Sequence, residues 1–154
     1  MVDVDALRTS LPDGVVATEP ATLENYRYVL TETNFPAERL VVEITETSLF
    51  GDMDLARNIV TSLKNQGIRL ALDDFGTGYS SLSYLLRVPF DKIKIDQSFV
   101  RGASDPDSRN AALIRAMIGL ARDLDMQTTA EGVETPEELL LVRNLGCSLV
   151  QGYI

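Results

Sequence analysis

Short apolar runs alternate with helix-patterned segments over most of the chain after residue 40. The apolar runs predict five strands, at residues 40–44, 68–72, 92–95, 126–130 and 147–150. Apolar residues at helical spacing predict a helix over 54–64, a short helix that carries Leu82, Leu85 and Leu86, and a longer helix whose apolar face holds Leu113, Met117, Leu120 and Leu124. The run Thr135-Pro136-Glu137-Glu138 predicts another helix start, since it combines a capping box with proline at the first helical position.

Strands separated by helices indicate successive β/α units, which require a parallel sheet with right-handed crossovers. Two α/β architectures fit this order: a TIM-like (β/α) barrel and a doubly wound open sheet. No Gly-x-Gly-x-x-Gly turn follows any of the predicted strands, which makes a dinucleotide-binding sheet the weaker of the two.

Polar residues recur where the predicted strands end. They are Glu43, Asp73 and Asp74, Lys94, Glu131 and Gln151, on or just after five consecutive strands. In a parallel barrel the carboxyl ends of the strands converge on one mouth, where the active sites of such barrels lie. We therefore expect these side chains to share one pocket.

The pair Asp73-Asp74 is open to two interpretations. Two carboxylates at a strand tip suit Mg²⁺ or Mn²⁺, and one carboxylate can bridge a pair of ions. The alternative is a turn whose acids only cap the next helix.

Composition narrows the classes of function. The chain has 154 residues, 45% of them hydrophobic, one cysteine, no histidine and a net charge of −9. The acidic balance without a basic cluster argues against binding duplex nucleic acid. The lack of a long apolar stretch predicts no membrane contact from this segment, and the single Cys147 fits a reducing cytoplasm. Without histidine, Ser/His and Cys/His nucleophilic catalysis are excluded.

Two hydrolytic chemistries fit the remaining residues. One is metal-assisted phosphodiester hydrolysis, with Glu43 and the two aspartates around divalent cations and Lys94 beside the nucleophile. The other is glycoside hydrolysis, with Glu43 and Glu131 as the pair of carboxylates. The chain has no tryptophan to stack on a sugar ring, and the aspartates would have no role there. Phosphodiester hydrolysis is therefore favoured.

Several segments together resemble one protein family. They are Val42-Glu43-Ile44-Thr45-Glu46, the loop 73–82, Lys92-Ile93-Lys94-Ile95-Asp96, Ala130-Glu131-Gly132-Val133-Glu134-Thr135 and Gln151-Gly152-Tyr153. In this order they resemble the EAL family, bacterial phosphodiesterases that linearise cyclic di-GMP to 5′-pGpG on a TIM-like barrel.

The resemblance implies a role for each matching position. It implies that Mg²⁺ or Mn²⁺, as a pair of ions, is held by Glu43, Asp73, Asp74 and Glu131. It implies that Lys94 orients the attacking water, that Gln151 lies near this water, and that Glu131 is a metal ligand or a general base. It also implies that the aspartate loop and its surroundings are supported by Glu46, Thr77 and Glu134. For Glu46 the alternative is a solvated acid that begins the next helix.

The chain departs from the family pattern near its beginning. The Glu-Ala-Leu signature is absent and would lie upstream of residue 1, and a complete barrel needs roughly 250 residues. We therefore expect an incomplete barrel over residues 37–154, preceded by an N-terminal segment, 1–36, that corresponds to an altered early strand and helix of the barrel. The family's metal-binding asparagine has no clear counterpart, because placing Asp3 there requires an insertion at about residues 11–20.

These expectations lead to two hypotheses for function. The first is hydrolysis of cyclic di-GMP, as part of a larger EAL domain. The second is a non-catalytic module that binds cyclic di-GMP or a protein partner. An incomplete barrel exposes a sheet edge and apolar interior surface, so we also expect the isolated chain to be a homo-oligomer.

Overall fold

The five predicted strands are present and form one parallel sheet. The computed structural model describes residues 28, 30–46, 53–77 and 85–153. The sheet has the order β1 (Val41–Thr45), β2 (Arg69–Phe75), β3 (Lys92–Ile95), β4 (Gln127–Glu131) and β5 (Leu149–Gln151). Every neighbouring pair is parallel. Within the described residues β1 and β5 are its two edges, so the sheet is open, and its sequential strand order is that of part of a TIM-like α/β barrel.

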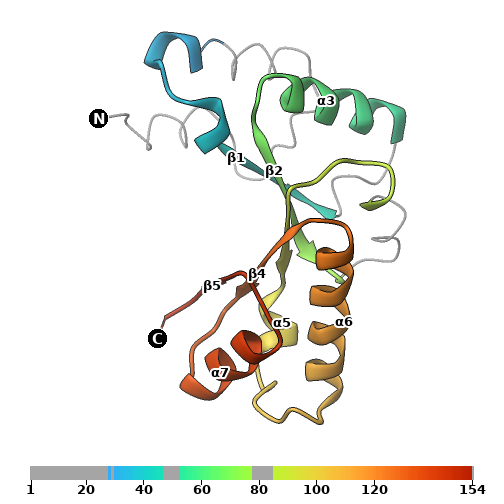
Figure 1. The fold of residues 1–154 in the computed structure, drawn as a ribbon, viewed down its shortest axis with the longest axis vertical. Coiled ribbons are helices and arrows are strands. Elements are labelled where there is room, and N and C mark those ends of the chain that lie inside the picture. The colour runs from blue at the N-terminus through green and yellow to red at the C-terminus, as the bar shows by residue number, and fades with distance from the viewer. Residues whose placement is uncertain (1–27, 29, 47–52, 78–84, 154) are drawn as a thin grey trace.

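Helices fill the connections between these strands. The described helical elements are η1 (Ala37–Arg39), α3 (Met53–Asn65), α5 (Gln97–Val100), α6 (Arg109–Asp123) and α7 (Pro136–Asn144). In Figure 1, α3 lies beside β2 at one end of the molecule, and α5, α6 and α7 lie together at the other end. Among the described residues, no helix combines the length and apolar character needed to cross a bilayer.

The capping box predicted for α7 is confirmed. Thr135 accepts a hydrogen bond from the Glu138 amide, and Glu138 accepts one from the Thr135 amide. Both bonds satisfy amides that the first turn of a helix leaves unpaired. Of the predicted short helix, Leu82 falls outside the described residues, whereas Leu85 is buried and Leu86 is exposed. The interpretation of Asp3 also falls outside the described residues.

The apolar face predicted for α6 is only partly correct. Leu113 is 45% exposed, whereas Met117 is buried as expected. The buried stripe of this helix consists of Ala111, Ile114, Met117, Ile118 and Ala121. Its small alanines let the helix approach β3 and β4 closely, and a prediction based on large leucines overlooks such positions.

The core lies between one face of the sheet and the helices. Alternate residues of the strands point to this face and are buried there, namely Ile44, Leu70, Leu72, Ile93, Ile95 and Ala130. From α3 the core receives Ile59, Val60 and Leu63, which the helical spacing predicted. Burial of these side chains supplies most of the driving force for folding, and it leaves the opposite face of the sheet for other residues.

Candidate metal and active site

The polar residues predicted at the strand ends lie on the face of the sheet that points away from the helical core. The register pairs Glu43 with Ala71, Ala71 with Lys92, Lys94 with Thr129, and Glu131 with Gln151. In-register residues of neighbouring strands point to the same face, and so do residues two apart along a strand. Glu43, Lys94, Glu131 and Gln151 therefore share one face with Asp73, two residues after Ala71.

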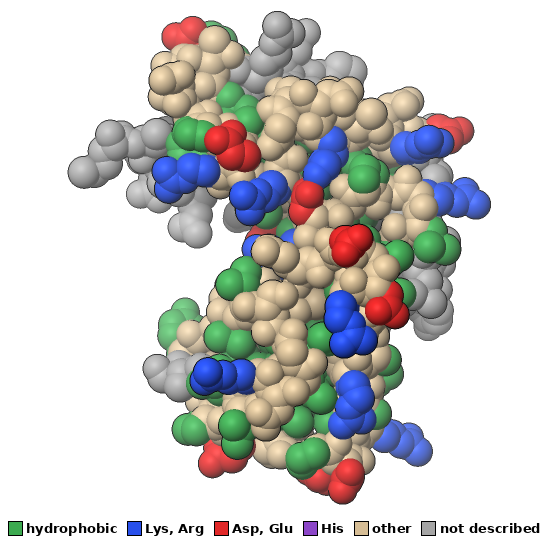
Figure 2. All heavy atoms as spheres, in the orientation of Figure 1, with side chains coloured by type: hydrophobic (Ala, Val, Ile, Leu, Met, Phe, Trp, Pro, Cys, Tyr) green, Lys and Arg blue, Asp and Glu red, His purple; other side chains and the backbone are tan. Residues whose placement is uncertain are grey.

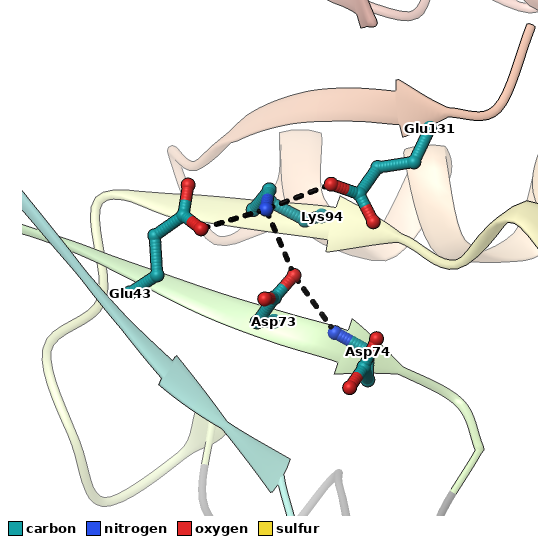
Figure 3. Close-up of polar contacts among 5 residues, drawn as sticks. All are labelled: Glu43, Asp73, Asp74, Lys94 and Glu131. Carbon is teal, nitrogen blue, oxygen red and sulfur yellow. Dashed lines mark hydrogen bonds and ion pairs between the residues drawn. The ribbon is translucent and has the colours of Figure 1, made fainter. Parts of the chain in front are cut away.

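Lys94 lies at the centre of this polar face (Figure 3). Its Nζ is 2.8 Å from Glu43 Oε2, 3.0 Å from Asp73 Oδ1 and 2.7 Å from Glu131 Oε1. Lys94 is only 6% exposed, and a buried ammonium without partners would be strongly destabilising. Three strands thus each contribute one carboxylate to a single buried cation.

The two adjacent aspartates reach the same side because the backbone of β2 is irregular. The strand continues to Phe75, three residues beyond its predicted end, and its register with β3 shifts between Leu72 and Phe75. Asp74 has a φ of 55°, in the left-handed region. Strict alternation would point Asp73 and Asp74 to opposite faces, so the shift and the left-handed residue together remove that alternation.

Three carboxylates are close enough to hold a cation between them. Oxygens of Asp73, Asp74 and Glu131 all lie within 4.8 Å of one another, and the three side chains are half-buried. Carboxylate oxygens are the ligands that Mg²⁺ and other hard divalent cations prefer. Glu43 joins this group through Lys94 and is itself 49% exposed at its side chain. The donor set therefore fits a divalent cation.

The electrostatics of the site reflect crowded negative charge. Burial, together with the charges of Asp73 and Asp96, raises the pKa of Asp74. Burial also raises the pKa of Glu131, although its hydrogen bond with Lys94 opposes this. Burial alone would lower the pKa of Lys94, but its hydrogen bonds to Glu131 and the other carboxylates raise it. Lys94 is therefore an ammonium at neutral pH.

Two of the predicted supporting residues contact the end of β2. Glu46 is fully buried and its Oε2 accepts a hydrogen bond from the Gly76 amide at 3.3 Å. This burial excludes the alternative of a solvated acid. Thr77 is exposed, and its hydroxyl donates to the Asp74 carbonyl oxygen at 2.9 Å. Both residues thus hold the backbone that carries the aspartates.

The other two predicted residues lie near the ends of β4 and β5. Glu134 is exposed and pairs with Arg101 at 3.0 Å, away from Lys94. Gln151 is the last residue of β5, beside Glu131 in register, with an exposed side chain. Within the described part of the chain, no hydrogen bond joins the Gln151 side chain to the carboxylates around Lys94. The structure therefore brings Glu43, Asp73, Asp74, Lys94 and Glu131 together and leaves Glu134 outside this group.

One polar residue next to the site, Asp96, was given no role from the sequence. Asp96 follows β3 directly, caps α5 through the Ser98 amide at 2.9 Å, and acts electrostatically on Asp74. Its position two residues after Lys94, at the end of the same strand, is the signal that could have revealed it.

The chain is similar to known proteins in both sequence and fold. Residues 14–154 match the EAL domain family. An uncharacterized signaling protein of Caulobacter vibrioides is 50% identical over 125 residues, which make up 81% of this chain and 15% of that protein. The cyclic di-GMP phosphodiesterase NbdA of Pseudomonas aeruginosa is 39% identical over 132 residues, or 86% of this chain and 17% of NbdA.

Solved structures of cyclic di-GMP complexes also match this chain. BlrP1 of Klebsiella pneumoniae, solved as a manganese and cyclic di-GMP complex, matches with a TM-score of 0.81 and 33% identity, over 88% of this chain and 34% of its own. The same protein has also been solved with calcium and cyclic di-GMP. This chain thus spans 34% or less of the length of these three proteins. By its match over residues 14–154, the chain belongs to the EAL domain family.

Proposed function

We propose that this chain forms the cation-binding and catalytic part of a site that hydrolyses cyclic di-GMP to linear 5′-pGpG. The observation that carries the proposal is the meeting of Glu43, Asp73 and Glu131 around Lys94. Asp74 lies beside them, within reach of a shared cation. Further support comes from relatives named as cyclic di-GMP phosphodiesterases and from the manganese complex of BlrP1.

The proposed cofactor is a pair of Mg²⁺ or Mn²⁺ ions. Asp73, Asp74 and Glu131 would hold them together with Glu43, because these residues offer carboxylate oxygens on one face of the sheet. Bound there, the cations would supply Lewis-acid stabilisation of the charge that develops on the phosphoryl oxygens.

Hydrolysis adds water across one P–O3′ bond and leaves a 5′ phosphate and a free 3′ hydroxyl. The Lys94 ammonium would orient the attacking water and stabilise negative charge on the phosphoryl oxygens electrostatically, from a position that its three carboxylate partners fix. Glu131 would accept a proton from that water as the P–O3′ bond breaks, and would pass it to the leaving O3′ to give the 3′ hydroxyl. The Gln151 amide would orient the water from the neighbouring strand.

The test is hydrolysis of cyclic di-GMP by the purified EAL domain that includes this chain, with Mg²⁺ or Mn²⁺, followed by chromatography of the product. We expect linear product from the wild type, none after chelation, and at least about 100-fold less from Asp73→Asn, because a cation ligand is lost. The control is Asp123→Asn, since Asp123 is exposed on α6.

Equal turnover by wild type and Asp73→Asn would contradict the proposed mechanism. Binding of cyclic di-GMP without product, with or without Mn²⁺, would support the non-catalytic module instead.

A further inference from the structure

Glu138, in the first turn of α7, is a buried carboxylate held by backbone amides. It is 6% exposed. Its Oε2 accepts from the Glu134 amide at 3.0 Å and from the Thr135 amide at 3.1 Å, and its Oε1 accepts from the Gly102 amide at 3.3 Å. The bond from Glu134, with those from Gly102 and Thr135, keeps the pKa of Glu138 below its ordinary value.

These contacts go beyond what a helix cap requires. A capping box needs only the bond from the Thr135 amide to Glu138 and its reciprocal. The bond to Gly102 instead reaches 36 residues back along the chain. No ion pair joins Glu138 to a cation in the described part of the chain, so amides from two separate segments stabilise this buried anion.

One of those segments leads back to Glu131. Gly132 has a φ of 64°, and a Cβ there would lie 2.5 Å from Gln97 Cβ, so its backbone packs directly against α5. The Val133 amide donates to the Gln151 carbonyl oxygen at 3.2 Å. The segment 131–135 is therefore fixed by α5, by the end of β5 and, at its far end, by Glu138.

The other segment leads back to Lys94. β3 ends at Ile95, Asp96 caps α5, and Gly102 follows the end of this short helix. Glu138 thus joins the segment that follows β3 to the segment that follows β4. These two strands carry Lys94 and Glu131, which form an ion pair of 2.7 Å.

We propose that Glu138 is a positioning residue, which fixes Glu131 relative to Lys94 by binding the segments that follow their two strands. The role of this placement in catalysis rests on the proposed function. The placement itself does not.

The test compares Glu138→Ala with Thr135→Ala in the full chain. Thr135→Ala removes the Thr135 side chain from the cap but keeps all three amide bonds to Glu138. Amide hydrogen exchange is measured for Glu131 and Val133 relative to Leu70 in β2, and the affinity for Mn²⁺ alone is measured by calorimetry.

In Glu138→Ala we expect exchange at Glu131 and Val133 to be about tenfold faster relative to Leu70, since a local opening becomes easier. Binding of Mn²⁺ should be about 3- to 10-fold weaker, because the candidate ligand Glu131 is held less firmly in position. Thr135→Ala should change both quantities by less than about twofold. Glu138→Gln keeps one acceptor oxygen, should give intermediate values, and serves if the alanine variant does not fold.

The proposal is overturned if Glu131 and Val133 exchange equally fast in Glu138→Ala and in Thr135→Ala. If Glu138→Ala does not fold, Glu138→Gln takes its place in this comparison. Glu138 would then be a helix cap alone. If the wild-type chain does not bind Mn²⁺, the proposed function fails, and the exchange comparison still decides the role of Glu138.

Discussion

Asp74 combines a strained backbone with a carboxylate in the candidate site. Its φ of 55° lies in the left-handed region, which costs about 1–2 kcal/mol for a residue with a Cβ. Its charge is also disfavoured there, because burial and the charge of Asp73 raise its pKa. A residue that is unfavourable in both respects, inside a well-packed strand, is typical of a functional site.

Replacing Asp74 should therefore separate stability from cation binding. We expect Asp74→Gly to unfold at the same temperature as the wild type or higher without metal, because glycine adopts this φ without strain. The same change should weaken Mn²⁺ binding at least about tenfold, because a candidate ligand is lost.

Thermal unfolding without metal gives the unfolding temperature, and calorimetry gives the affinity for Mn²⁺. Asp74→Asn is the control for charge, since asparagine tolerates the left-handed region. A clear loss of stability in Asp74→Gly would show that the Asp74 side chain stabilises the metal-free fold.

At the scale of elements, the end of β5 packs against the turn that follows β4. A Cβ at Gly152 would lie 1.9 Å from the Val133 carbonyl oxygen and 2.7 Å from its amide nitrogen. Both atoms are backbone and cannot rotate away. Close approach of two backbones thus holds β5 beside the turn next to Glu131.

We expect Gly152→Ala to lower the free energy of unfolding by about 3 kcal/mol or more, because the turn and β5 must separate to admit the methyl group. Gly119 provides the matched control. It lies inside α6, where a Cβ would meet no atom within 4 Å. Gly119→Ala should raise stability by about 0.5–1 kcal/mol through helix propensity. Denaturant unfolding measures the free energy of unfolding of both variants. Similar changes in the two would contradict the packing argument.

The elements that local pattern determines were predictable from the sequence. The five strands and the capping box of α7 depend on apolar runs and on residues three apart, and both are confirmed. The irregular end of β2 was not predictable, because a register shift depends on the neighbouring strand. The bond from Gly102 to Glu138 was likewise hidden, since no local pattern joins residues 36 apart.

In the candidate site, too, some features were predictable from the sequence and others were not. Positions at strand ends were sufficient to group Glu43, Asp73, Asp74 and Glu131, since parallel strands direct their carboxyl ends to one edge. That Lys94 is paired with three carboxylates at once is a matter of side-chain geometry, which residue order does not determine.

At the scale of the whole molecule, apolar side chains are exposed near the β5 edge of the sheet. They are Leu149, Val150 and Tyr153, and Leu140 on α7 is also exposed. On the face seen in Figure 2, hydrophobic side chains are most numerous over the part that holds α5, α6 and α7, with charges of both signs scattered around them. An edge strand with exposed apolar residues favours pairing with another chain.

We therefore expect the purified chain to sediment as a dimer or larger species in analytical ultracentrifugation. Leu149→Lys should shift it toward monomer, since a charge on an edge strand opposes pairing. Leu113→Lys is the control, because Leu113 on α6 is 45% exposed, much like Leu149 at 46%. A monodisperse wild-type monomer would contradict the expectation, and a response only to Leu113→Lys would place the contact on α6.

The ion pairs of Lys94 have a consequence for how a divalent cation could enter. Glu43, Asp73 and Glu131 would repel one another if no positive charge lay between them, and the ammonium already neutralises part of that repulsion. Their oxygens are thus gathered before any metal arrives, so little of the binding free energy is spent on assembling them. An incoming ion has only to share these oxygens with an ammonium that is anchored to its own strand.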